Sequence, residues 1–170
     1  IKRILKRTGF PPQQLVVELT ESLLLDTLEK TADTLRELRA MGIEIAIDDF
    51  GTGYSTFKLL KQLPIDILKI DQMFIQDLLE NRVDAAITQA IIDVAHALDM
   101  RVIAEGVEKA EHVKLLQELG CDSIQGFYLS EALPRQEISK LLHIGIPGKT
   151  RQRHSKTSNT VTDDATATTA

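Results

Sequence analysis

The sequence predicts an α/β protein built on parallel strands, either an open sheet or a (β/α) barrel. Short apolar runs rich in β-branched residues alternate with longer segments of helical period. This alternation is typical of βαβ units, whose strands pair in parallel through right-handed crossovers. Gly42 and Gly120 each follow a helical pattern at the point where a left-handed residue often ends a helix.

Five strands are expected, in chain order, with helices between them. The strands are predicted over Leu15–Leu19, Ile43–Ile47, Ile65–Ile70, Arg101–Ala104 and Asp122–Phe127. Apolar residues recur at helical spacing over Leu28–Leu38, Ile87–Leu98 and Val113–Leu119. From about Gly145 onward the apolar periodicity is lost, and Thr, Ser, Ala and charged residues dominate. We therefore expect a folded domain over residues 1–145 and a disordered tail over residues 146–170.

The composition is typical of a soluble globular chain of one domain. The chain has 170 residues, of which 43% are hydrophobic and 26% charged, and its formal net charge is -5. This mild acidity argues against nucleic acid or an anionic membrane as the main partner, because either would favour a basic face. Cys121 is the single cysteine, and the sequence shows neither a signal peptide nor a long apolar span. These features predict a cytoplasmic setting for this segment, although upstream domains could anchor a longer protein to a membrane.

Polar residues stand at the end of every predicted strand. They are Glu18, Asp48, Asp49, Lys69, Glu105 (just past its strand) and Gln125. Because the carboxyl ends of parallel strands lie on one face, we expect these side chains to converge on one patch. Consecutive strand residues normally point to opposite faces, so Asp48 and Asp49 are predicted to reach one site only because the strand ends there.

Several carboxylates on one patch would repel each other unless cations lay among them. All the candidate ligands are oxygens, which favours a hard cation such as Mg²⁺ or Mn²⁺. A carboxylate that bridges two ions, with a neighbour on the second ion, suits a two-metal hydrolase. Lys69 could then hold a phosphate oxygen or an attacking hydroxide. The segment Gly51–Gly53 lacks the Lys-Ser/Thr of a phosphate-binding loop, so we interpret it as a glycine-hinged loop at the site.

Five blocks of the sequence resemble, in order, blocks of the EAL-domain family. They are Glu18–Ser22 (ELTES), Asp48–Ser55 (DDFGTGYS), Leu68–Asp71 (LKID), Ala104–Glu108 (AEGVE) and Gln125–Phe127 (QGF). The resemblance covers roughly residues 1–145. It implies a TIM-like (β/α) barrel of EAL type that hydrolyses cyclic di-GMP to linear pGpG with two Mg²⁺ or Mn²⁺ ions. It also implies a homodimer that forms through the EAL domain.

The resemblance further implies roles for single residues. Glu18 and Asp48 resemble ligands of the first metal ion, and Asp48 resembles the bridge to the second ion, which Asp49 also binds. Lys69 resembles the residue that contacts the hydrolytic water and the phosphate. Glu105 resembles the general base or water-orienting carboxylate. The supporting residues implied are Glu108, Gln125 and Glu21, the last of which resembles the anchor of the Asp48–Ser55 loop.

One part of the family pattern is absent from the sequence. The Glu-Ala-Leu signature and an Asn from the following strand would both lie upstream of Ile1. A complete barrel takes about 250 residues and eight strands. We therefore expect an N-terminally truncated barrel with about five of the eight strands, and we expect the isolated chain to be inactive. Two alternatives stay open: a non-catalytic regulatory module that binds cyclic di-GMP or dimerises, and an open flavodoxin-like sheet with a Mg²⁺ site.

Overall fold

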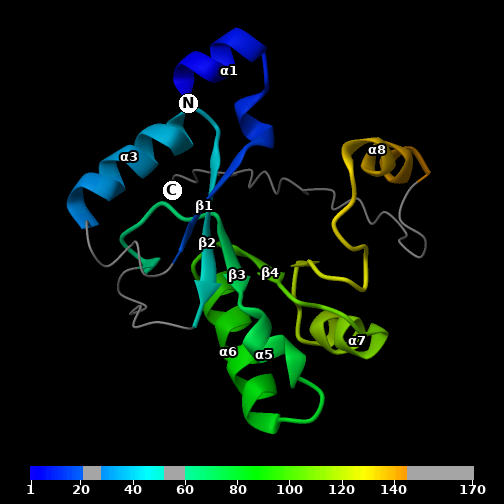
Figure 1. Cartoon of the computed structure of the whole chain (residues 1–170). Helices are drawn as coiled ribbons and strands as arrows, with labels where there is room; N and C mark the ends of the chain where they lie inside the picture. Colours follow the sequence, from blue (N-terminus) through cyan, green and yellow to red (C-terminus); the bar gives the residue numbers. More distant parts are fainter. Residues whose placement is uncertain (21–27, 52–59, 145–170) are drawn as a thin grey trace, which may run out of the picture. The chain divides into compact units, whose positions relative to one another are not determined.

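The computed structural model describes residues 1–20, 28–51 and 60–144 (Figure 1). The chain divides into two units, Ile1–Ala132 and Leu133–Ala170. The first unit contains all five strands, and the second contains the helix α8 (Arg135–Ile144). The predicted disordered tail, residues 146–170, lies outside the described residues.

The elements of the first unit alternate between strands and helices as the sequence predicts. The strands are β1 (Val16–Thr20), β2 (Glu44–Phe50), β3 (Ile67–Ile70), β4 (Arg101–Ala104) and β5 (Ser123–Ile124). The helices are α1 (Lys2–Thr8), the 3-10 turn η1 (Pro12–Gln14), α3 (Leu28–Ala40), α5 (Gln72–Gln76), α6 (Arg82–Ala97) and α7 (Ala110–Glu118). Among the described residues, no helix is long enough and apolar enough to cross a membrane.

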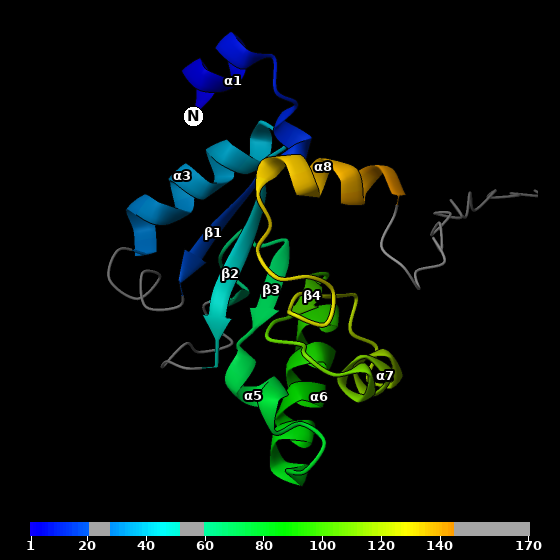
Figure 2. The same cartoon turned by 45° about the vertical axis from the view of Figure 1, so that its right-hand side comes forward.

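The five strands form one parallel sheet in the order β1-β2-β3-β4-β5, and Figure 2 shows the first four side by side. This order follows the chain, as in a (β/α) barrel, where each strand lies beside its predecessor. A flavodoxin-like sheet has the order 2-1-3-4-5. The observed order therefore excludes the open alternative and is consistent with part of a TIM-like barrel.

The boundaries of four of the five strands differ from the predicted ones. The first strand is shifted by one residue, to Val16–Thr20. The prediction ends the second strand at Ile47, whereas β2 continues to Phe50. The third strand begins at Ile67 instead of Ile65, and the fifth is reduced to Ser123–Ile124. Strand ends depend on which backbone groups find a partner in the neighbouring strand, and periodicity alone does not report that pairing.

The core lies along the two central strands. Every residue of β3 is buried, and so are Ile45, Ala46 and Ile47 of β2. Such strands are typical of parallel sheets covered by helices. Each fully buried Ile or Leu side chain contributes about 1.5–3 kcal/mol of transfer free energy. The carboxyl ends of these strands are therefore held on a rigid support.

Aspartates fix the register at the amino end of the sheet. Asp66, which precedes β3, accepts a 3.0 Å hydrogen bond from the Ile45 backbone N–H and pairs with Arg39 at 2.9 Å. Asp122, which precedes β5, accepts a 2.8 Å hydrogen bond from the Val102 N–H. Each carboxylate binds a neighbouring strand at its start. These hydrogen bonds help to fix the register of β2 against β3 and of β4 against β5, and so the relative positions of their carboxyl ends.

His112 on α7 is a polar residue inside the core. Its side chain is only 2% exposed, and neither ring nitrogen has a hydrogen-bond partner among the residues that the structure describes. Burial lowers the pKa of His112, and so does the nearby Lys109, while Glu108 and Glu111 act in the opposite direction. The folded protein therefore resists protonation of this ring.

We predict that replacing His112 makes the domain less sensitive to acid. As the pH falls below about 6.5, the unfolded chain binds a proton that folded His112 resists, so the free energy of unfolding decreases. His112→Leu and His112→Gln should both flatten this decrease, measured by urea unfolding between pH 8 and pH 5.5. Only His112→Leu should also raise stability at pH 8, because it removes the unpaired ring nitrogens. Unchanged pH dependence in both variants would show that His112 is not the source.

Candidate active site

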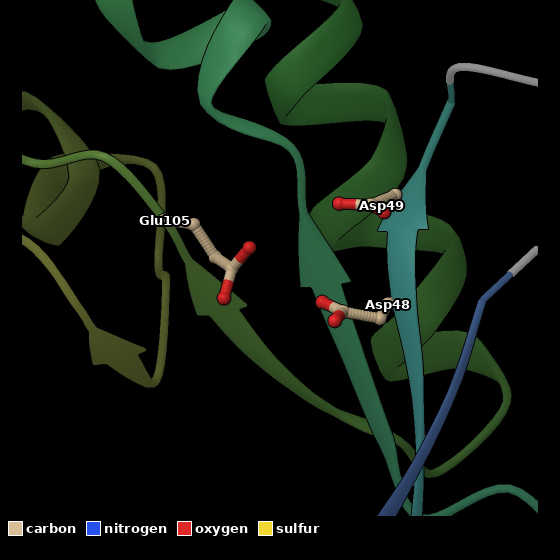
Figure 3. A group of neighbouring side chains, drawn as sticks. All are labelled: Asp48, Asp49 and Glu105. Carbon is tan, nitrogen blue, oxygen red and sulfur yellow. The ribbon is translucent and has the colours of Figure 1, made fainter.

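Three carboxylates gather at the carboxyl end of the sheet. Asp48 and Asp49 belong to β2, and Glu105 directly follows β4. One oxygen of each lies within 4.8 Å of the others, and Figure 3 shows the three side chains directed toward a common space. The predicted convergence of strand-end residues is thus present for these three residues.

A bulge in β2 brings the adjacent Asp48 and Asp49 to the same site. The register of β2 against β3 shifts between Ile47 and Phe50, and Asp49 has a positive φ of 55°. Asp is among the few residues that adopt this left-handed conformation at modest cost. We predicted that Asp48 and Asp49 reach one site because the strand ends there. This reason was wrong. The strand continues, and the irregularity within it redirects one of the two side chains.

Lys69 lies at the centre of the carboxylates. Its Nζ lies 2.7 Å from Asp48 Oδ1, 2.7 Å from Glu105 Oε1 and 3.1 Å from Glu18 Oε2. The residue is only 4% exposed. Burial by itself lowers the pKa of Lys69, but the contacts with Asp48, Glu105 and Glu18 outweigh it and raise the pKa well above its usual range. The ammonium group therefore stays charged and joins residues from β1, β2, β3 and the end of β4.

The donor set fits a hard divalent cation. Asp48 Oδ1 is buried and accepts no well-aligned hydrogen bond from the described residues, so its short contact with Lys69 is an ion pair only. A carboxylate oxygen with unused lone pairs is a good ligand for Mg²⁺ or Mn²⁺. Asp48, Asp49 and Glu105 carry three formal negative charges against the single charge of Lys69. A metal ion would bring this part of the site toward neutrality.

The predicted ligand Glu18 lies at the margin of this group. Its side chain is 49% exposed, and its short contact is with Lys69. The trio that lies close enough to share an ion contains Glu105 instead, the residue predicted as the general base. Glu21 and the loop residues 52–55 lie outside the described residues.

Asp71 is a site residue to which the sequence analysis assigned no role. Burial raises the pKa of Asp49, and the charges of Asp48 and Asp71 and a hydrogen bond with Asp71 raise it further, against the lowering effect of Lys69. Asp71 also caps α5, since its Oδ1 accepts a 2.7 Å hydrogen bond from the Met73 backbone N–H. Asp71 could have been identified from the sequence by its position at a strand end, because it directly follows the last residue of β3. An Asp in front of a helix is more often interpreted as a cap alone.

A hollow of about 300 Å³ opens beside the carboxylates. It is lined by Asp49, Asp71, Gln72, Glu105, Gly106, Glu108, Gln125, Gly126 and Phe127. The predicted supporting residues Glu108 and Gln125 are therefore in the wall of the same space. Phe127, which is 67% exposed, adds an aromatic surface to the wall. The wall thus combines four carboxylates with an exposed aromatic ring, and a phosphate would need a bound cation to lie beside these carboxylates.

Gly126 allows this wall to form. A Cβ at this position would collide with the backbone N and O of Val107. The close approach lets the Val107 N–H donate a 3.1 Å hydrogen bond to the Gln125 carbonyl, and the Gln125 N–H donates one of 2.8 Å to the Ala104 carbonyl. Gln125 is thereby fixed beside the end of β4.

Comparison with known proteins assigns the chain to a family. The pattern described as "EAL domain" matches residues 1–132. The chain belongs to the EAL-domain family. It is 45% identical over 142 residues to the signaling protein YkoW of Bacillus subtilis, covering 84% of this chain and 18% of that protein. It is 41% identical over 138 residues to the bifunctional diguanylate cyclase/cyclic di-GMP phosphodiesterase MucR of Pseudomonas aeruginosa, covering 81% of this chain and 20% of that protein.

Solved EAL structures share the fold. The PaMucR phosphodiesterase in complex with c-di-GMP superposes with a TM-score of 0.77 at 41% identity, over 81% of this chain and 56% of that chain. A manganese/cy-diGMP complex of Klebsiella pneumoniae BlrP1 superposes with a TM-score of 0.70 at 34% identity, over 75% of this chain and 32% of that chain. The chain thus spans about a fifth of the length of these curated relatives and part of the length of the solved structures.

Proposed function

We propose that the EAL domain containing this chain hydrolyses cyclic di-GMP to linear pGpG with two Mg²⁺ or Mn²⁺ ions. The observation that carries the proposal is the carboxylate trio of Asp48, Asp49 and Glu105 within 4.8 Å, beside the buried ammonium of Lys69. The names of the relatives support it, because MucR is a cyclic di-GMP phosphodiesterase and the BlrP1 complex contains manganese with the cyclic dinucleotide.

Each residue has a defined part in this proposal. Glu18 and Asp48 would hold the first ion, and Asp48 and Asp49 would hold the second. The ions supply, when bound, polarisation of the phosphate and a more acidic water. Lys69 holds a phosphate oxygen by a charge-assisted hydrogen bond as negative charge develops on it. The Glu105 carboxylate accepts a proton from the attacking water, whose oxygen bonds to phosphorus as one phosphorus–oxygen ester bond breaks. The released ribose oxygen takes up a proton, and the ring opens to linear pGpG.

We also propose that the domain works as a homodimer. Several apolar side chains on and between α5 and α6 are exposed: Met73 by 53%, Leu79 by 42% and Val83 by 63%. Clustered exposed apolar residues are common in protein interfaces. The alternative function, a regulatory module that binds cyclic di-GMP without cleaving it, would use the same hollow and the same dimer. It differs only in the absence of turnover.

The first test of the proposal is Asp49→Asn in the complete domain. Hydrolysis should be abolished while the fold stays nearly intact, because the change removes a charge from the second metal site without changing volume. The measurements are pGpG by chromatography and thermal unfolding by circular dichroism. Asp77→Asn, at the exposed position that follows the last residue of α5, is the control and should keep full activity. Wild-type turnover by Asp49→Asn would disprove the two-metal assignment.

A second test separates Lys69 from the metal ligands. Lys69→Ala should lower kcat by a factor of about 10² or more, since it removes a group that stabilises developing charge. It should not weaken metal binding. Single-turnover hydrolysis and calorimetric titration with Mn²⁺ measure the two effects. A loss of Mn²⁺ affinity as large as that of Asp49→Asn would show that Lys69 belongs to the ligand set.

A third test concerns residues 1–170 by themselves. We expect no hydrolysis, because the described first-ion ligands are only Glu18 and Asp48, and because β1 and β5 are edge strands with one neighbour each in the described sheet. Supplying the upstream barrel segment should restore pGpG formation under the same conditions. Robust turnover by residues 1–170 alone would make the upstream ligands dispensable.

A further inference from the structure

Lys69 and a metal ion would draw on the same carboxylates. The ammonium lies 2.7 Å from Asp48 Oδ1 and 2.7 Å from Glu105 Oε1. Asp48 and Glu105 are also two of the three residues whose oxygens lie close enough to share an ion. The Lys69 ammonium group therefore lies where the proposed metal ion would bind.

Burial of the Lys69 ammonium destabilises the fold unless its contacts with the carboxylates are kept. Its side chain is 5% exposed, and a buried ammonium must be paired to be tolerated. The reverse dependence also holds. In the part of the chain that the structure describes, Lys69 is the only cationic side chain in an ion pair with Asp48 or Glu105. Without it, strand ends from β2 and β4 would bring unbalanced negative charges together.

We propose that Lys69 is the resident counter-ion of the metal-free site. It holds the ends of β1, β2 and β4 together when no divalent ion is bound, and by its charge it weakens the binding of that ion. The inference rests on the proposed metal site but not on hydrolysis. Its consequence is that the wild-type domain keeps its fold after chelation, whereas a neutral residue at this position makes the fold depend on metal.

The test is Lys69→Met in the complete domain, since Met is similar in length and has no charge. In EDTA its melting temperature should fall by roughly 5 °C or more relative to wild type. Added Mn²⁺ should restore most of this loss, so the Mn²⁺-induced shift is larger in the variant than in wild type. Calorimetric titration should show Mn²⁺ binding at least about tenfold tighter, because a positive charge has been removed from beside the ion. Lys114→Met, at an exposed position on α7, is the control and should behave as wild type.

If Lys69→Met fails to fold in EDTA, a second variant tests whether the unbalanced charge of the carboxylates is the cause. Lys69→Met with Glu18→Gln removes one of the three carboxylates that contact the ammonium and should regain part of the stability in EDTA. A Lys69→Met protein that unfolds only on chelation supports the proposal.

Other outcomes would overturn it. These are an equal loss of melting temperature with and without Mn²⁺, a failure to fold even in Mn²⁺, and Mn²⁺ binding that is unchanged or weaker. None of these measurements uses cyclic di-GMP. A domain that shows the metal-dependent stability but makes no pGpG would therefore contradict the proposed hydrolysis and leave the counter-ion role in place.

Discussion

The buried ion pairs of Lys69 are the interaction on which the rest of the site depends. Parallel pairing brings the ends of β1, β2 and β4 together around β3, and each of these ends carries a carboxylate. Such a sheet would be disfavoured by charge repulsion at its carboxyl end. A lysine on the central strand removes much of this cost, because one ammonium contacts Glu18, Asp48 and Glu105 at 3.1 Å or less. Without a bound metal ion, the acidic site and the strand order are therefore compatible because of one basic residue.

The two ends of the sheet have opposite chemistry. At the amino end, Asp66 and Asp122 accept backbone hydrogen bonds from neighbouring strands. Their carboxylates are thereby engaged in the structure of the sheet. At the carboxyl end, the Asp48 carboxylate has a buried oxygen that accepts no hydrogen bond from the residues that the structure describes. Carboxylates satisfied by backbone donors fix the register, whereas carboxylates with unused lone pairs can bind an ion. This division between a stabilising face and a reactive face is typical of (β/α) barrels.

Sequence periodicity and strand-end polarity were sufficient to predict the parallel pairing of the strands, though not their order, and the meeting of Asp48, Asp49 and Glu105. They could not predict the bulge at Asp49, because a bulge is a property of the pairing between β2 and β3 and leaves no local pattern. They also could not separate the two roles of Asp71, since a helix cap and a site carboxylate have the same sequence signature. Nor does a Lys at a strand end indicate by itself that it is almost completely buried.

The short helix α5 contacts the segment that contains Asp49 and also carries an exposed apolar residue. Asp71 caps this helix, and its proximity raises the pKa of Asp49. Phe74 on the same helix packs against Gly51, where a Cβ would lie 2.6 Å from the ring. Asp49 within the bulge and Gly51 just after it are thus supported by one helix, whose exposed side carries Met73. Asp49 has a left-handed backbone conformation, which the contacts of α5 with this segment help to maintain. Asp49, the proposed ligand of the second ion, is therefore the carboxylate of the trio whose position depends on α5, the helix that also carries the exposed Met73.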